Sequence, residues 1–209
     1  MQLTVHTFVT LDGVMQAPGG AEEDTSGGFA HGGWLVPHVD EVFGEIVNDW
    51  FARATSILLG RNTFLAMRGY WPLVTDPDNP VATALNGLPK YLVSSTMDDP
   101  AWGDTTILGG DVLEQVRRLK EQPGDELQVH GSWRLAGTLH RAGLVDEYRL
   151  LTFPVTVGAG KRLFTDDGPA SGFRLLESRT TGTGVVYLRL APAAFTTGTV
   201  AVEEGREVV

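Results

Sequence analysis

The chain has 209 residues, a formal net charge of −10 and no cysteine, and 42% of its residues are hydrophobic. The missing cysteine excludes a disulfide framework, a thiolate nucleophile and a cysteine metal site, and the acidic balance disfavours a nucleic-acid surface or an anionic membrane as partner. This length and composition predict a globular protein with a real core, in one large domain or two small ones.

The N-terminal part predicts a soluble, cytoplasmic protein that begins with a strand. It has no basic segment before a long apolar run, and no apolar run approaches the ~18 residues of a membrane span. Residues 2–10 alternate apolar with polar side chains and predict a strand that ends before Asp12-Gly13. Residues 16–33 are rich in glycine and acids and predict a long loop, either a lid or merely flexible. Residues 37–54 carry apolar side chains at helical spacing and predict the clearest helix.

The middle of the chain predicts strands that alternate with helices. Residues 72–89 carry prolines and little periodicity, which predicts a loop. Asp111 lies three residues before Glu114 and predicts the capped start of a helix. The expected strands are 56–59, 90–93, 105–108 and 126–130, and further helices are expected at 63–68, after Asp111 and after Ser132.

The C-terminal part predicts a long strand at 145–155 and a hairpin of 172–180 with 185–190. Strands alternating with helices indicate an α/β fold, a mixed and mainly parallel sheet flanked by helices, to which the final hairpin adds antiparallel strands. Residues 1–191 are expected to form one domain, and 192–209 a tail or an edge strand.

Three strand ends share one pattern, because each continues into small or polar residues. They read Gly60-Arg61-Asn62-Thr63, Ser94-Ser95-Thr96 and Gly131-Ser132. Ligands of open α/β sheets bind at the carboxyl ends of the strands, so parallel strands would bring these turns to one edge. A helix that starts there aims unpaired N–H groups at the edge, which suits phosphate. Taken alone, each turn can also be an ordinary cap or tight turn.

Together the three turns predict a dinucleotide site. Gly131 and Ser132 would meet the pyrophosphate through backbone N–H groups, and Thr63 would do so from the neighbouring turn. Arg61 would pair with a further phosphate, such as a ribose 2′-phosphate, because its planar fork makes two parallel contacts. The Ser94-Ser95 pair would donate hydroxyls to the same group.

Other motifs are excluded by their spacing. Gly158-Ala159-Gly160-Lys161 resembles the end of a P-loop, but Val155 stands at the first glycine position and Arg162 at the Ser or Thr position. No G-x-G-x-x-G follows the first strand, and the five histidines lack metal-ligand spacing. Ser132 lacks the G-x-S-x-G elbow of hydrolases.

The same residues resemble a known superfamily. The segments are TLDG at 10–13, ILLGRNTF at 57–64, KYLVSST at 90–96 and VHGSWRLAGTLHRAGLVDEYRLLTFPVTVGAGKRLF at 129–164. Their order is similar to that of dihydrofolate reductase-like proteins, and more closely to the C-terminal reductase domain of bacterial riboflavin biosynthesis enzymes. The resemblance spans most of residues 2–190, and it implies a mixed sheet flanked by helices and the reduction of a small heterocyclic or carbonyl-type substrate by NADPH.

The resemblance also implies roles for individual residues. It places Gly60, Arg61 and Thr63 at the adenosine phosphate, Ser94 and Ser95 in support, and Gly131, Ser132 and Trp133 at the pyrophosphate. Asp12 would lie near the substrate as proton donor or anchor, although an Asp before Gly is often only a turn residue. The candidates for the substrate wall are Trp34, Trp50 and Phe153, each of which can also be plain core.

The chain departs from the family pattern in three respects. Dihydrofolate reductases place a carboxylic acid five residues after a Trp, and Val39 stands there, with Asp40 about 100° further around a helix. The usual Gly-Gly before the cofactor helix is His130-Gly131. Basic residues for a phosphosugar are not evident either, so neither folate nor the riboflavin precursor is the expected substrate.

Two functions of different classes follow from the sequence. The first is an NADPH-dependent reductase of a small substrate, and the second is a non-catalytic protein that binds a nucleotide or small ligand on the same fold. A flavin-dependent site is a third possibility. A homodimer is also expected, because the terminal hairpin and tail leave sheet edges to cover.

Overall fold

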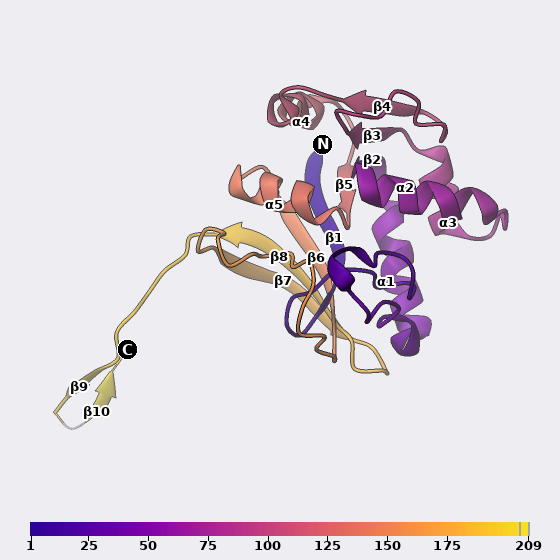
Figure 1. Ribbon diagram of the computed structural model, residues 1–209. Helices are drawn as coiled ribbons and strands as arrows, with labels where there is room; N and C mark the ends of the chain where they lie inside the picture. Colours follow the sequence, from indigo (N-terminus) through magenta and orange to yellow (C-terminus); the bar gives the residue numbers. More distant parts are fainter. Residues whose placement is uncertain (205, 209) are drawn as a thin grey trace.

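One eight-stranded sheet forms the body of the molecule (Figure 1). The computed structural model describes residues 1–204 and 206–208. The strands of the main sheet are β1 (Gln2–Thr10), β2 (Ala54–Gly60), β3 (Lys90–Val93), β4 (Thr105–Leu108), β5 (Glu126–His130), β6 (Glu147–Phe153), β7 (Gly172–Thr180) and β8 (Val186–Ala193). Their order across the sheet is β4-β3-β2-β5-β1-β6-β8-β7. The strands from β4 to β6 are parallel, and β8 and β7 follow as an antiparallel hairpin. The predicted fold class is therefore confirmed.

Helices cover both faces of this sheet. They are α1 (Glu41–Ala52), α2 (Arg61–Tyr70), α3 (Pro80–Gly87), α4 (Val112–Glu121) and α5 (Trp133–Arg141). On β2, Ile57 and Leu59 pack in one core with side chains of α1, α2 and α3, whereas Leu58 packs in a second core with α4 and α5. The two cores arise because successive side chains of a strand point to opposite faces.

The helix predicted over 37–54 is confirmed in its middle but not at its start. Pro37 lies in a short 3-10 turn, η2 (Val36–His38), and α1 begins only after Asp40. The Asp40 carboxylate accepts a hydrogen bond from Phe43 N at 2.8 Å, which satisfies an N–H group of the first turn. Val39, one of the apolar residues in the stretch predicted as helix, precedes this cap and is 51% exposed.

The loop predicted over 72–89 is wrong, because this segment contains α3. The helix begins at Pro80, and the Asn79 side chain accepts a hydrogen bond from Ala82 N at 2.9 Å. Proline suits the first helical position, where its missing N–H would have no partner. A 3-10 turn, η3 (Trp71–Leu73), precedes it. Proline marks the helix start here and does not exclude a helix.

The C-terminal tail leaves the body of the molecule as an extended arm (Figure 1). It ends in a separate two-stranded sheet of β9 (Ala201–Glu203) and β10 (Arg206–Val208), so the predicted edge strand does not join the main sheet. Residues 205 and 209 of the predicted tail lie outside the described residues. Among the described helices, none combines the length and the apolar character that crossing a bilayer demands.

Candidate functional site

The three turns singled out in the sequence lie along one edge of the sheet. β3, β2 and β5 are adjacent and parallel, so their carboxyl ends meet there. Gly60 pairs in register with Val93, which places Arg61 beside Ser94. Leu58 of β2 pairs in register with Val129 of β5, so the turn that follows β2 also lies beside the turn that follows β5. The geometric part of the prediction is thereby confirmed.

Hydrogen bonds lock two of these turns together. The amide of Gly60 donates to Ser132 Oγ at 3.0 Å, and the amide of Ser132 donates to Thr63 Oγ1 at 3.1 Å. Gly131 and Ser132 have φ angles of 55° and 57°, in the left-handed region. Glycine adopts this region without steric cost, which explains its presence at position 131. The starts of α2 and α5 are consequently held side by side.

These two helix starts lack the side-chain caps that the other helices have. Asp40, Asn79 and Asp111 cap α1, α3 and α4, whereas no side chain caps α2 or α5. Uncapped first turns leave N–H groups that can bind an anion. The edge therefore presents two helix N-termini toward the same region.

The amides of Gly131 and Ser132 are not the free donors that the sequence suggested. Gly131 N donates to His6 O at 3.2 Å, and Ser132 N is engaged by Thr63. The first turn of α5, which begins at Trp133, supplies the remaining N–H groups. The site thus shifts by one to two residues into the helix, and Gly131 and Ser132 shape the turn that aims it.

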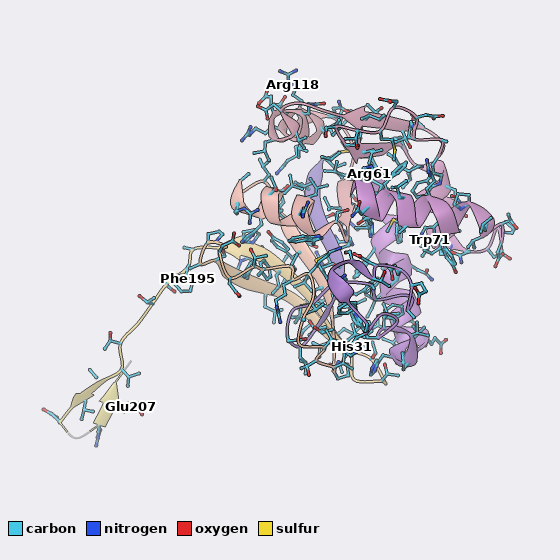
Figure 2. The ribbon with its side chains drawn as sticks, in the orientation of Figure 1. His31, Arg61, Trp71, Arg118, Phe195 and Glu207 are labelled. Atoms are coloured by element: carbon cyan, nitrogen blue, oxygen red, sulfur yellow. The ribbon has the colours of Figure 1, made fainter. Side chains whose placement is uncertain are left out.

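Arg61 supplies a cation at this edge. It is the first residue of α2, two residues earlier than the predicted helix start, because Gly60 occupies the cap position. Its side chain is exposed and forms no ion pair with any residue from 1–204 or 206–208. Figure 2 shows Arg61 at the start of α2, near α5. On the neighbouring turn, Ser94 Oγ accepts hydrogen bonds from Thr96 N and Met97 N, which leaves its own O–H free to donate.

His130, which replaces a family glycine, does not obstruct the edge. Its ring points to the α1 face, where it stacks on Phe51 at 4.6 Å between centroids and contacts Gln128 Oε1 at 3.0 Å. Burial lowers the pKa of His130 to about 3, with the Arg149 charge adding to the effect. The imidazole is therefore a neutral part of the core.

Asp12 fastens two loops at the end of β1. Its carboxylate accepts hydrogen bonds from Thr10 Oγ1 at 2.5 Å and Gly158 N at 2.7 Å, and Arg162 Nε donates to its carbonyl at 2.9 Å. Despite partial burial, which acts in the opposite direction, these hydrogen bonds lower the pKa of Asp12. An ionised carboxylate with these partners suits an anchor, and it disfavours the predicted role as proton donor.

The three aromatic residues predicted for a substrate wall lie in the core. Phe153 is 0% exposed, Trp50 2% and Trp34 8%. Phe153 packs edge-on against Trp34 at 5.2 Å, and Trp34 Nε1 donates to Gln16 O at 2.8 Å. In this conformation Trp50 and Phe153 are too buried to contact a ligand, which corrects their assignment, and Trp34 supports the 16–33 loop from inside.

A cavity of about 370 Å³ lies between the 16–33 loop and the segment after β6. Its walls include Gln16, Phe29, His31, Val157 and Lys161. Sequence reasoning missed this set, although it had noted both the acidic loop and the Gly158–Lys161 motif. The missing information was the pairing of Lys161 with Asp24, 137 positions earlier in the chain.

Comparison with known proteins shows that the family and the fold of this chain are reductase-like. The sequence matches the family described as the RibD C-terminal domain over residues 1–187, and the chain belongs to this family. The uncharacterised protein YyaP of Bacillus subtilis (strain 168) is 30% identical over 182 residues, which cover 86% of this chain and 89% of YyaP.

Solved structures support the same fold. A putative riboflavin biosynthesis protein from Shewanella sp. PV-4 superposes with a TM-score of 0.64 at 20% identity, over 93% of this chain and all of the other. Dihydrofolate reductase from Enterococcus faecalis, solved with NADP(H), gives a TM-score of 0.58 at 12% identity, over 92% of this chain and 97% of the other. The predicted resemblance is confirmed for family and fold.

Proposed function

We propose that this protein is an NADPH-dependent reductase of a small, heterocyclic substrate. The observation that carries the proposal is the joined pair of uncapped helix starts at the β2 and β5 ends, with the exposed guanidinium of Arg61 beside them. Two N-termini and one cation on a single edge suit the several phosphates of a dinucleotide.

The chain's own residues would hold this cofactor along the edge. The first turns of α5 and α2 would bind the pyrophosphate, with Trp133 as the first donor of α5 and Thr63 on α2. Arg61 would pair with the ribose 2′-phosphate, and Ser94 and Ser95 would donate hydroxyls to it. When bound, NADPH supplies a hydride, which with one proton reduces a double bond of the substrate and leaves NADP⁺.

Folate is not the substrate that this chain favours. Asp40, the carboxylate nearest to the family's acid position, caps α1 and also accepts a hydrogen bond from Thr183 N at 3.2 Å. These hydrogen bonds lower the pKa of Asp40, with that from Phe43 N the largest cause. These contacts occupy one acceptor site on each carboxylate oxygen and hold Asp40 at its own helix, which disfavours a role in orienting a pterin.

The decisive experiment is turnover with a panel of acceptors. NADPH oxidation is followed with pterins, pyrimidines, quinones and carbonyl compounds, and the reduced product is identified by mass spectrometry. Stoichiometric oxidation of NADPH with one acceptor supports the reductase. A yellow colour of the purified protein would instead indicate a flavin.

A non-catalytic binding protein is the second candidate. The observation that favours it is that Asp12 and Asp40, the two acids near the edge, are both ionised and hydrogen-bonded. Neither is a ready proton donor. NADPH binding without oxidation across the whole panel would select this alternative.

The reductase is further proposed to act as a homodimer in the cytoplasm. β7 is the last strand of the sheet, and it exposes Leu175 by 54%. The C-terminal arm leaves the body and exposes Val202 by 75% (Figure 1). An exposed strand edge and an isolated short hairpin are both unstable arrangements in water. A second copy of the chain would cover both.

A further inference from the structure

We propose that the cavity between the 16–33 loop and residues 157–161 is the substrate pocket, and that the Asp24–Lys161 ion pair makes it select uncharged rings over anions. This inference rests on the proposed reductase function, whose substrate it narrows. The cavity has a volume of about 370 Å³, which accommodates a small ring compound.

The cavity follows directly from the sheet. Gln16 comes after β1 and Val157 after β6, and these strands are parallel neighbours of each other, with β5 on the far side of β1. The pocket therefore continues the edge that carries Gly131. Arg61 and His31 lie well apart in Figure 2. An extended dinucleotide anchored at Arg61 can run along this edge toward the loop that carries His31.

The charge of Lys161 is neutralised inside the cavity wall. Its Nζ contacts the carboxylate of Asp24 and lies 2.7 Å from Ser26 Oγ. Hydrogen bonds from Lys161 and Ser26 lower the pKa of Asp24, outweighing the opposing effect of burial, so the pair is ionised. An anion that approached Lys161 would meet the Asp24 carboxylate at the same point.

The neighbouring cation and amide are engaged in the same way. Arg162 donates to Asp12 O and to Gly158 O, the latter at 2.6 Å. Gln16 Nε2 donates to Asp24 O and Ser26 O, and its Oε1 accepts from Lys161 N at 3.1 Å. Arg162 Nη2 also lies 3.8 Å from Asp12 Oδ2, so Lys161 and Arg162 each have a carboxylate partner and neither offers an unpaired charge to a ligand.

The remaining surface suits a flat, uncharged ring. Phe29, Ala30 and Val157 supply apolar walls. Gly160 lets the chain approach Val14 and Phe29 closely, since a Cβ at Gly160 would lie 2.6 Å from Val14 Cγ1 and 3.2 Å from Phe29 Cε2. His31 lines the cavity with an exposed ring, edge-on to Phe29 at 5.9 Å. It can exchange one hydrogen bond with a ring nitrogen or carbonyl.

The test uses two probes that share one ring system, quinoxaline and quinoxaline-2-carboxylate, of which only the second carries a negative charge. Their affinities for the full chain are measured by calorimetry and ligand-observed NMR, without NADPH. The wild type should bind quinoxaline at least about ten-fold more tightly than its carboxylate, because the pocket offers no net positive charge. Asp24→Asn frees Lys161 and should raise affinity for the carboxylate by about ten-fold.

Three variants control this comparison. Glu22→Gln removes one exposed acid from the same loop without touching Lys161 and should leave both affinities unchanged. Lys161→Met removes the cation and should not raise carboxylate binding. Ala159→Trp fills the cavity from an exposed position and should abolish binding of quinoxaline.

The inference is overturned if the wild type binds neither probe, or binds both equally, or if Asp24→Asn melts as the wild type does and leaves the ratio unchanged. Should Asp24→Asn fail to fold, the wild-type ratio and Ala159→Trp still decide. NADPH binding is titrated separately. Failure to bind NADPH would remove the reductase proposal while these probes still reported on the pocket.

Discussion

Ser132 Oγ accepts a hydrogen bond of 3.0 Å from Gly60 N, and this contact joins the beginnings of α5 and α2 across 72 positions of sequence. The return bond, from Ser132 N to Thr63 Oγ1, closes the junction at 3.1 Å. A serine in the left-handed region has a conformational cost, which these bonds offset. The junction sets the direction in which both helix starts point.

Ser132→Ala should loosen this junction. The variant leaves Gly60 N without its partner, so the free energy of unfolding should fall by about 1–2 kcal/mol, and NADPH affinity should fall several-fold because the two helix starts are no longer held together. Urea denaturation and a fluorescence titration measure the two effects. Thr138→Ala, which removes an exposed hydroxyl from the same helix, is the matched control. An unchanged NADPH affinity in Ser132→Ala would show that the junction is irrelevant to the site.

Asp12→Asn should release the segment after β6. The carboxylate accepts from both Val157 N and Gly158 N, and an amide retains only one acceptor oxygen. We expect a loss of about 1–3 kcal/mol in the free energy of unfolding, the range for hydrogen bonds to charged groups. Hydrogen exchange should increase at residues 156–160. If turnover falls while exchange and stability stay unchanged, Asp12 acts on the substrate directly and the anchor interpretation is wrong.

Acid should destabilise the fold through two buried histidines. Burial is the largest cause of the lowered pKa of both His6 and His130, and the pKa of His130 falls to about 3. Above pH ~6.5 the unfolded chain also has neutral histidines, so nothing is lost. Below it, the unfolded state binds protons that the folded state cannot, so stability falls as pH drops from about 6.5 toward about 3.

The slope of this loss is measurable. Each such histidine contributes about 1.4 kcal/mol per pH unit in that window. Urea denaturation between pH 7 and pH 5, compared with the variant His130→Phe, tests it. The variant keeps an aromatic ring stacked on Phe51, and it should reduce the pH dependence of the free energy of unfolding by the contribution of one histidine. Equal slopes in both proteins would contradict a neutral, buried His130.

Removal of the arm should change the oligomeric state. Light scattering after size-exclusion chromatography should show a dimer for the full chain and a monomer for a chain that ends at Phe195. Leu175→Lys places a charge on the exposed strand β7 and should have the same effect. A full chain that is monomeric at all concentrations would contradict the proposed homodimer.

The secondary structure could be predicted from the sequence where the hydrophobic pattern and the turn residues agreed. β1, β3, β4 and β5 have the predicted bounds, because their apolar runs are short and bounded by turn residues. The errors arose where an N-cap residue sets the start of a helix. Asp40 caps α1, so the helix begins at Glu41 and not at the start of the periodic stretch, and Asn79-Pro80 starts α3 inside a segment that proline content alone marked as loop. An N-cap residue followed by proline at the first helical position is typical of a helix start, so Asn79-Pro80 could have predicted α3.

The candidate site was readable only in part. The topology rule brought Arg61, Ser94 and Gly131 to one edge, and it required only parallel strands. The sequence could not predict that Trp50 and Phe153 are buried, because an aromatic stripe has the same spacing whether it faces a core or a ligand. The pairing of Lys161 with Asp24 depends on two loops meeting in space, which no local pattern encodes.

The central claim is most directly tested by calorimetric titration of the wild type and Arg61→Ala with NADPH and NADH, with Arg117→Ala on α4 as the control for loss of an exposed arginine. We predict micromolar binding of NADPH by the wild type, at least about ten-fold tighter than NADH, and loss of most of that preference in Arg61→Ala alone. Equal affinities for the two nucleotides, or no binding of NADPH, would contradict the proposed cofactor site.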